Sequence, residues 1–155
     1  MYYYIYESLI GPLCLVEEDQ KLIECSFGTN GKGVLKETEF LKGVIKELQE
    51  YFNHQRTSFT IPINPSGTHF QKKVWQALTT IPYGETRTYK EIAIQAGNEK
   101  ACRAVGMANH NNPIAIIVPC HRVIGTSGKM VGYAGGLDKK ETLLNLENND
   151  KKRGK

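Results

Sequence analysis

A short segment, Asn64-Pro65-Ser66-Gly67, divides the chain into two parts with different patterns of apolar residues. Proline and glycine close together interrupt both helices and strands, so no regular element is expected to run through this segment. The 155 residues are therefore expected to fold as two small units. With 40% hydrophobic and 23% charged residues, the composition is that of a globular protein and excludes a disordered chain.

The first part, residues 1–66, has the pattern of a small sheet followed by a helix. Three runs are short, rich in Tyr, Ile, Val, Leu and Phe, and separated by turn residues: 2–6, 13–17 and 21–27. Such runs indicate strands joined as a meander. Between 36 and 53 the apolar residues recur at spacings of one, three and four, which predicts one buried helix face. A further strand is expected at 58–63.

The second part has the pattern of helices separated by glycine-rich loops. Helices are expected at 69–80, 89–96, 99–109 and 138–147. Thr68 is the expected N-cap of the first, and Thr88 begins a capping box with Glu91 before the second. Gly97 is suited to end that helix in the left-handed conformation. The second and third helices together resemble a helix-turn-helix, in which the loop 125–136 would be the wing. We therefore expect an α/β fold, with a small N-terminal sheet-plus-helix domain and a mostly helical, winged helix-turn-helix-like C-terminal domain.

The net charge of +4 is unevenly distributed along the chain. Residues 1–66 carry 6 basic and 9 acidic side chains, whereas 67–147 carry 10 basic and 6 acidic ones. The tail, 148–155, is basic and is expected to be disordered. If the protein has a polyanionic partner, the second part is expected to meet it, although a net charge of this size also serves solubility alone.

Nothing in the sequence predicts a membrane segment or an export signal. The longest apolar run, 114–118, is far below the roughly 18 residues needed to span a bilayer. The N-terminus has no basic start followed by an apolar core. We therefore expect a cytoplasmic protein without membrane contact.

The four cysteines form no Cys-x-x-Cys pair, which argues against a zinc ribbon or a thioredoxin-type redox pair. Cys14 and Cys25 lie in apolar runs and are expected to be small buried hydrophobic residues, with a metal site formed with a distant His as a lesser alternative. Cys102 is expected to pack in a helix. Cys120 differs, because Pro119-Cys120-His121-Arg122 places a thiol beside an imidazole and a guanidinium.

Cys120 is the candidate nucleophile. A thiol reacts as its thiolate, so it needs a base such as His121, and a carboxylate such as Glu147 can orient that base. Neighbouring side chains of an extended chain point to opposite faces, so direct pairing of Cys120 with His121 requires a turn, or else a water between them. From the residues alone, a buried cysteine next to a surface histidine remains the alternative.

The residues around Cys120 carry a resemblance to a known family. Ile117-Val118-Pro119-Cys120-His121-Arg122-Val123-Ile124, with Asn112-Pro113 before it, resembles the O6-alkylguanine-DNA alkyltransferases. Four more motifs match at suitable distances: Ile81-Pro82-x-Gly84-x-x-x-x-Tyr89, Arg103-Ala104-Val105-Gly106, Tyr133-Ala134-Gly135-Gly136-Leu137 and Leu143-Leu144-x-x-Glu147. The resemblance covers roughly 68–147. The first part matches only in layout, where this family has a ribonuclease H-like domain.

The resemblance implies stoichiometric DNA repair. Similar proteins transfer an alkyl group from O6 of guanine in DNA irreversibly to their own cysteine, and O4-alkylthymine is a further substrate to consider. By this resemblance Cys120 is the acceptor, His121 is the base acting through a water, and Glu147 holds the other ring nitrogen. Asn112 would be the hinge residue beside the cysteine segment, and Tyr89 would donate its proton to the leaving guanine.

The resemblance also implies how DNA is bound. The alkylated base must leave the duplex, and Arg103 matches the arginine that fills the vacated gap. Ala104 and Gly106 are small, which would let this helix approach the minor groove closely. Lys100 and Lys129 are expected phosphate contacts. The expected partner is double-stranded DNA containing O6-alkylguanine, bound by a monomer.

Tyr133, Ala134 and Gly135 are the expected substrate pocket, where backbone amides can donate to the alkylated oxygen. Ala134 stands where many relatives carry Ser, and Asn111 where Gly is frequent. The role of Arg122 stays open, and a structural role in neutralising Glu147 or the last helix is the alternative to catalysis. The zinc-binding residues of some relatives have no convincing counterparts, so neither a metal nor another cofactor is expected.

Three other classes compete with this prediction. Alkyltransferase-like proteins bind damaged DNA but lack the acceptor cysteine, which is present here as Cys120. A transcriptional regulator would need a further DNA-binding domain. A Cys-His hydrolase would have no use for the surrounding DNA-binding motifs.

Overall fold

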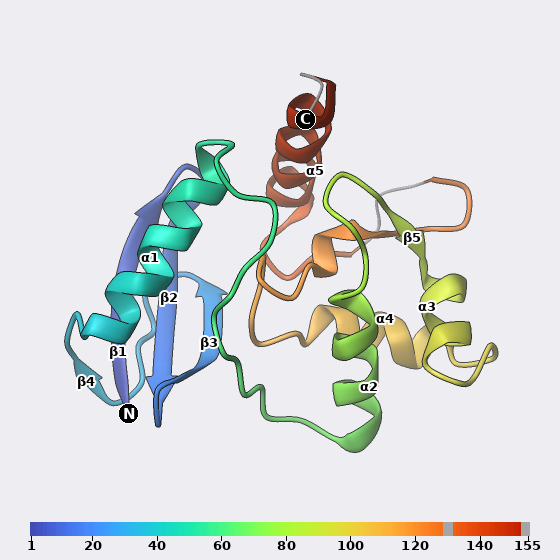
Figure 1. The fold of residues 1–155 in the computed structure, drawn as a ribbon. Helices are drawn as coiled ribbons and strands as arrows, with labels where there is room; N and C mark the ends of the chain where they lie inside the picture. The colour runs from blue at the N-terminus through green and yellow to red at the C-terminus, as the bar shows by residue number, and fades with distance from the viewer. Residues whose placement is uncertain (129–131, 153–155) are drawn as a thin grey trace. The chain divides into compact units, whose positions relative to one another are not determined.

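The computed structural model describes residues 1–128 and 132–152, and the chain divides into two compact units, Met1–Ser66 and Gly67–Lys155. The mixed α/β fold expected from the sequence is confirmed, with a sheet and a helix in the first unit and mainly helices in the second (Figure 1). No helix in the described part of the chain is both long and apolar enough to cross a membrane.

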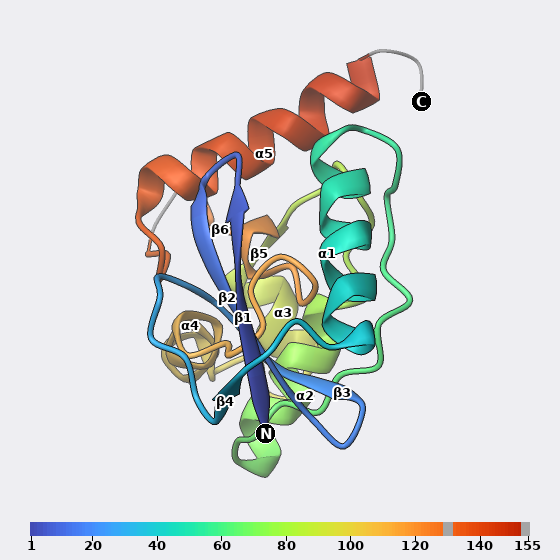
Figure 2. The same ribbon diagram turned by 90° about the vertical axis from the view of Figure 1, so that its left-hand side faces the viewer.

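The sheet of the first unit has the strand order β3-β2-β1-β4. β1 (Tyr2–Ser8), β2 (Gly11–Glu18) and β3 (Lys21–Phe27) form the expected antiparallel meander. Asp19 and Gln20 join β2 to β3, and both have positive φ, as the tight hairpin turn that matches strand twist requires. A short strand that the sequence did not reveal, β4 (Val34–Leu35), pairs in parallel with the beginning of β1 (Figure 2).

Helix α1 (Glu39–Phe52) packs on this sheet through the apolar face expected for it (Figure 1). Thr38 caps the helix by accepting from the amide of Leu41, and its hydroxyl donates to the buried carboxylate of Glu17. The strand expected at 58–63 is wrong, because only Ile63 forms an isolated bridge with Leu22. The proline preceding Ile63 has no amide hydrogen to donate, so this segment cannot continue a ladder.

In the second unit the predicted starts of the first two helices are confirmed. Helix α2 (His69–Leu78) begins with a capping box between Thr68 and Gln71, and α3 (Tyr89–Gln95) with one between Thr88 and Glu91. Gly97 has φ +98° and follows α3, as expected. Helix α4 (Cys102–His110) begins three residues later than predicted and has no side-chain cap.

The three helices α2, α3 and α4 pack on one another, with α3 and α4 joined by the Gly97 turn. The indole of Trp75 on α2 donates to the carbonyl of Ala108 on α4 at 2.8 Å, deep in the core. This hydrogen bond fixes the end of α4 that precedes the cysteine segment.

After α4 the chain forms a compact turn segment, a short strand β6 (Val123–Ile124) and helix α5 (Leu137–Lys152). Strand β6 pairs in parallel with β5 (Arg87–Thr88), which leads into α3. Residues 129–131 of the expected wing, 125–136, lie outside the described residues, and Lys129 is one of them. Helix α5 continues through residues 148–152, so the disorder expected for that part of the tail is wrong. Residues 153–155 of the tail lie outside the described residues.

Candidate active site

The segment before Cys120 is built from consecutive tight turns. The amide of Ile117 donates to the carbonyl of Ala115 across Ile116, which has φ +72°, so this turn is a γ-turn with a strained β-branched centre. The amide of Cys120 donates to the carbonyl of Val118 across Pro119, whose φ of −80° and ψ of 64° give the inverse γ-turn. The chain thus bends sharply twice before it reaches the cysteine.

Cys120 begins a 3-10 turn, η1 (Cys120–Arg122). Side chains in such a turn project about 120° apart, so Cys120 and His121 are not on opposite faces as they would be in a strand. Direct pairing of Cys120 with His121 was expected to require a turn at this point, and η1 is such a turn. Cys120 and His121 are both buried, with side chains 4% and 0% exposed, so the alternative of a surface histidine is wrong.

His121 is held by a buried carboxylate. Its Nε2 lies 2.7 Å from Oε2 of Glu147, and both side chains are almost fully buried. Burial lowers the pKa of His121, with Arg122 and Lys140 adding to this effect, while Glu147 opposes it. The ring is therefore neutral near pH 7, with the Nε2 hydrogen on the side of Glu147. Nδ1 has no hydrogen-bond partner among the described residues, which leaves it as a proton acceptor.

Arg122 completes the hold on Glu147. Its Nε lies 2.8 Å from Oε1 and its Nη2 3.0 Å from Oε2, while Nη1 donates to the carbonyl of Ile81 at 2.8 Å. Burial alone would raise the pKa of Glu147, but the hydrogen bonds and charges of His121 and Arg122 outweigh it and keep the pKa well below its ordinary value. Arg122 thus lies on Glu147, one of the groups that it was expected to neutralise.

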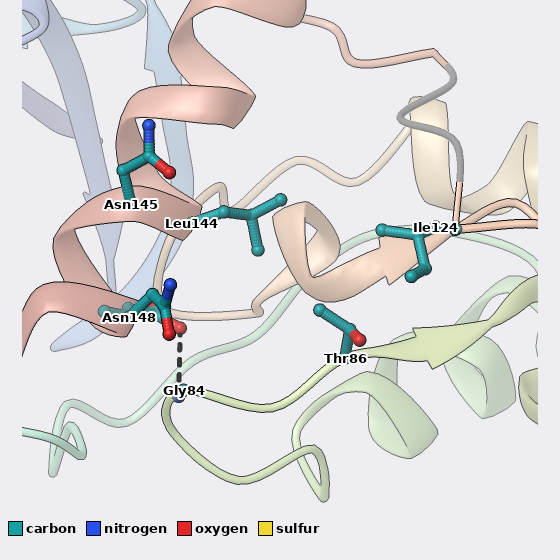
Figure 3. A pocket seen from close by; sticks show the side chains of 8 residues that line it. Gly84, Thr86, Ile124, Leu144, Asn145 and Asn148 are labelled. Atoms are coloured by element: carbon teal, nitrogen blue, oxygen red, sulfur yellow. Dashed lines mark hydrogen bonds between the residues drawn. The ribbon is translucent and has the colours of Figure 1, made fainter. Parts of the chain in front are cut away.

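The backbone amide of Gly84 also donates to Oε1 of Glu147, at 3.3 Å (Figure 3). Gly84 lies in the turn between α2 and β5, so the carboxylate joins this turn to α5 and η1. A cavity of about 280 Å³ opens next to this contact, between Thr86, Ile124 and the α5 residues Leu144 and Asn148.

Asn112 fastens the turn segment before the cysteine. Its Nδ2 donates to the carbonyls of Val118 at 2.9 Å and Ile114 at 3.2 Å, and its Oδ1 accepts from the amide of Ile114. The Asn112 side chain also lowers the pKa of the Cys120 thiol, against the effect of burial. These contacts place Asn112 beside the cysteine segment, where the resemblance implies a hinge residue.

Burial raises the pKa of the Cys120 thiol, whereas Asn112, Lys140 and Tyr133 oppose this rise. Tyr89, the first residue of α3, is half-buried, and burial followed by the charge of Cys120 raises the pKa of its phenol. The structure therefore brings the five residues expected to be catalytic to one place, together with Tyr133 of the expected pocket.

Two residues at the site were missed in the sequence. Lys140 is fully buried, and its Nζ donates to the carbonyl of Val123 at 2.6 Å. Burial lowers the pKa of Lys140, and Cys120 opposes this. Asn109 is 3% exposed, and its Nδ2 donates to the carbonyl of Cys120 at 3.3 Å. Lys140 was detectable, because it precedes Leu143 by three residues and Glu147 by seven, on one helix face.

The residues expected to bind DNA lie on or next to α4. Arg103 and Ala104 are exposed, Gly106 is partly exposed, and Lys100 is exposed just before the helix. Of the expected pocket, Ala134 is exposed and Gly135 partly exposed, in the turn that leads to α5. In the described part of the chain, no group of three or more His, Cys, Asp or Glu side chains is placed to hold a metal ion.

Comparison with known proteins gives the family. Residues 69–149 match the model of the 6-O-methylguanine DNA methyltransferase DNA-binding domain, and residues 1–65 match that of the ribonuclease-like domain of the same enzymes. The chain belongs to the 6-O-methylguanine DNA methyltransferase family. The resemblance carried by the motifs around Cys120 is thereby confirmed.

Individual members of this family are similar over nearly the whole chain. The methylated-DNA–protein-cysteine methyltransferase of Methanosarcina acetivorans is 52% identical, over 95% of this chain and 98% of the relative. That of Mycobacterium leprae is 50% identical, over 91% and 88%. The crystal structure of Mycobacterium tuberculosis OGT in complex with DNA matches with a TM-score of 0.88 and 44% identity, over 97% of this chain and 94% of that one. The O6-methylguanine DNA methyltransferase of Methanococcus jannaschii matches with a TM-score of 0.70 and 28% identity, over 93% and 92%.

Proposed function

We propose that this protein repairs DNA by transferring an alkyl group from O6 of guanine to Sγ of Cys120, once per molecule. The observation that carries the proposal is the buried Cys120–His121–Glu147 arrangement in a chain of this family. A thiol nucleophile with a neutral, carboxylate-held imidazole beside it has the parts needed for attack on an alkyl carbon.

The proposed reaction begins with the proton of Cys120. Nδ1 of His121 accepts it through a bridging water, while Nε2–H donates to Glu147. The thiolate then attacks the alkyl carbon, the carbon–sulfur bond forms, and the carbon–O6 bond breaks with its electron pair going to guanine. Tyr89 donates a proton to the departing base as its negative charge grows. Tyr89 is reprotonated from His121, so overall the thiol proton ends on guanine.

The product at Cys120 is a thioether, which water does not readily hydrolyse, unlike a thioester. No second half-reaction regenerates the thiol, so each molecule acts once. O4-alkylthymine presents an alkyl carbon in the same chemical setting, and we include it as a second substrate of the site.

DNA binding is assigned to the exposed face of α4. Arg103 has no acidic neighbour within that helix, and the small Ala104 and Gly106 let the helix come close to a sugar-phosphate backbone. We propose that α4 enters the minor groove, that Arg103 occupies the gap left by the extrahelical base, and that Lys100 contacts a phosphate. Tyr133, Ala134 and Gly135 line the base pocket.

We assign these steps to a C-terminal domain beginning at residue 67, with residues 1–66 as a separate ribonuclease H-like domain. The protein is proposed to act as a monomer on double-stranded DNA, in the cytoplasm. Neither a metal nor another cofactor takes part in the proposed chemistry.

The proposal is tested by mass spectrometry. The protein is incubated with a duplex that carries one O6-methylguanine, digested, and mapped. We expect one methyl group per molecule on Cys120, no turnover beyond one equivalent, and complete loss of transfer in Cys120→Ala. Cys102→Ser is the matched control and should react like the wild type, since Cys102 is exposed on α4. Continued turnover, or methyl on another cysteine, would contradict the proposal.

A further inference from the structure

The side chain of Asn109 lies against the segment that carries the proposed nucleophile. It projects from the buried face of α4, and Nδ2 donates to the carbonyl of Cys120 at 3.3 Å. The Asn109 side chain also lowers the pKa of the Tyr89 phenol, against the effect of burial. Oδ1 has no hydrogen-bond partner in the described part of the chain, so the contact to the cysteine segment is made by Nδ2 alone.

This arrangement determines which end of the amide is free. If the amide were turned over, Oδ1 would face the carbonyl oxygen of Cys120, and two acceptors would oppose each other. Asn109 is 3% exposed, so the free Oδ1 is a buried acceptor without a donor. Such groups are rare in folded proteins, because their loss of hydration is not compensated. A buried acceptor at a reaction site is therefore suited to an N–H group of the substrate.

We propose that Oδ1 of Asn109 accepts a hydrogen bond from the 2-amino group of the extrahelical O6-alkylguanine. This inference rests on the proposed function, which places that base between Tyr89 and Cys120. When guanine is alkylated at O6, N1 no longer carries a hydrogen. The 2-amino group is then the N–H donor that the base retains. Asn109 presents an acceptor to the one donor that the lesion retains, and this contact distinguishes it from alkylated bases without an amino group.

The contact is tested by comparing two proteins on two substrates, so that the residue and the substrate group are each removed separately and together. Single-turnover rates of methyl transfer are measured for the wild type and Asn109→Ala, each with O6-methylguanine and O6-methylhypoxanthine in the same duplex. O6-Methylhypoxanthine lacks only the 2-amino group. For the wild type we expect removal of this group to slow the reaction about tenfold, as when a buried acceptor loses its donor. For Asn109→Ala we expect less than about a twofold difference between the two substrates.

The ratio of the two rates isolates Oδ1 from the other contacts of Asn109. Loss of Nδ2 disturbs Tyr89 and Cys120 equally for both substrates, so it slows both without changing their ratio. Asn109→Ser is a second variant in case Asn109→Ala does not fold, and iodoacetamide alkylation of Cys120, followed by peptide mapping, reports the nucleophile without a base. An equal loss in the wild type and both variants, or no loss in the wild type, overturns the contact. Failure of the wild type to accept methyl from O6-methylguanine instead overturns the proposed function.

Discussion

At the scale of single residues, the carboxylate of Glu147 is the most heavily used group of the site. Nε2 of His121, the guanidinium of Arg122 and the amide of Gly84 all lie within hydrogen-bonding distance of its two oxygens. Because His121 is neutral, Arg122 supplies the only full positive charge among these three. The charge of the buried carboxylate is therefore balanced by Arg122 rather than by the base it orients.

We predict that Arg122→Met destabilises the protein by about 3 kcal/mol, because it leaves a buried carboxylate without its counter-charge. Urea unfolding at pH 7 measures this free energy. Arg87→Met is the control, since Arg87 pairs with Glu85 at 3.2 Å with both side chains substantially exposed. Its loss should stay below about 1 kcal/mol. Equal losses in the two variants would show that Glu147 does not depend on Arg122.

At the scale of elements, the second unit contains two helices with the same N-terminal device. Thr68 before α2 and Thr88 before α3 each accept from the amide three residues on, and Gln71 and Glu91 each return a contact. The two helices differ in length and in their first residue. Helix α2 has ten residues, whereas α3 has only seven and starts with Tyr89. Unravelling of its first turn would move the phenol that faces Cys120.

We predict that Thr88→Ala and Thr68→Ala each lower the free energy of unfolding by about 1 kcal/mol, the usual cost of losing such a cap. Only Thr88→Ala should also slow methyl transfer from O6-methylguanine, because only α3 begins with Tyr89. Urea unfolding and single-turnover rates on the same samples separate the two effects. If Thr68→Ala slows transfer equally, the positioning of Tyr89 by its cap is contradicted.

The elements also show where sequence reasoning succeeds and where it stops. Caps, glycine turns and amphipathic faces are local, so α1, α2 and α3 were placed from their own residues. Strand β4 has only two residues and exists because it meets β1, which no local pattern reveals. Asn109 is buried where α4 meets the cysteine segment, and a polar residue at such a position looks like a surface residue in a sequence.

At the scale of the whole molecule, the site couples stability to pH. His121 and Glu147 both have a folded-state pKa below the ordinary values of 6.5 and 4.5. The unfolded chain therefore takes up protons before the folded chain does on acidification. Both groups contribute stability that is present above the ordinary pKa and is lost as the pH falls below it.

We predict that thermal stability changes little between about pH 7 and 8 and decreases below pH 6.5 through His121, then further below pH 4.5 through Glu147. Other carboxyl groups titrate in the same range, so variants are compared with the wild type. In Glu147→Gln the decrease below pH 4.5 should be smaller, and in His121→Gln the decrease between pH 6.5 and 4.5 should be smaller. Melting temperatures in a pH series measure both. Curves parallel to the wild type would contradict the assignment.

Helix α5 places two charged side chains in the core, Lys140 beside Val123 and, seven positions further along the helix, Glu147 beside His121. Each residue of a helix adds about 100° of rotation and 1.5 Å of rise. Deleting one residue from 141–146 would turn one of the two charges out of the core, whichever end of the helix stayed in place. During evolution, residues of α5 can therefore be substituted. An insertion or deletion between Lys140 and Glu147, in contrast, would destroy the site.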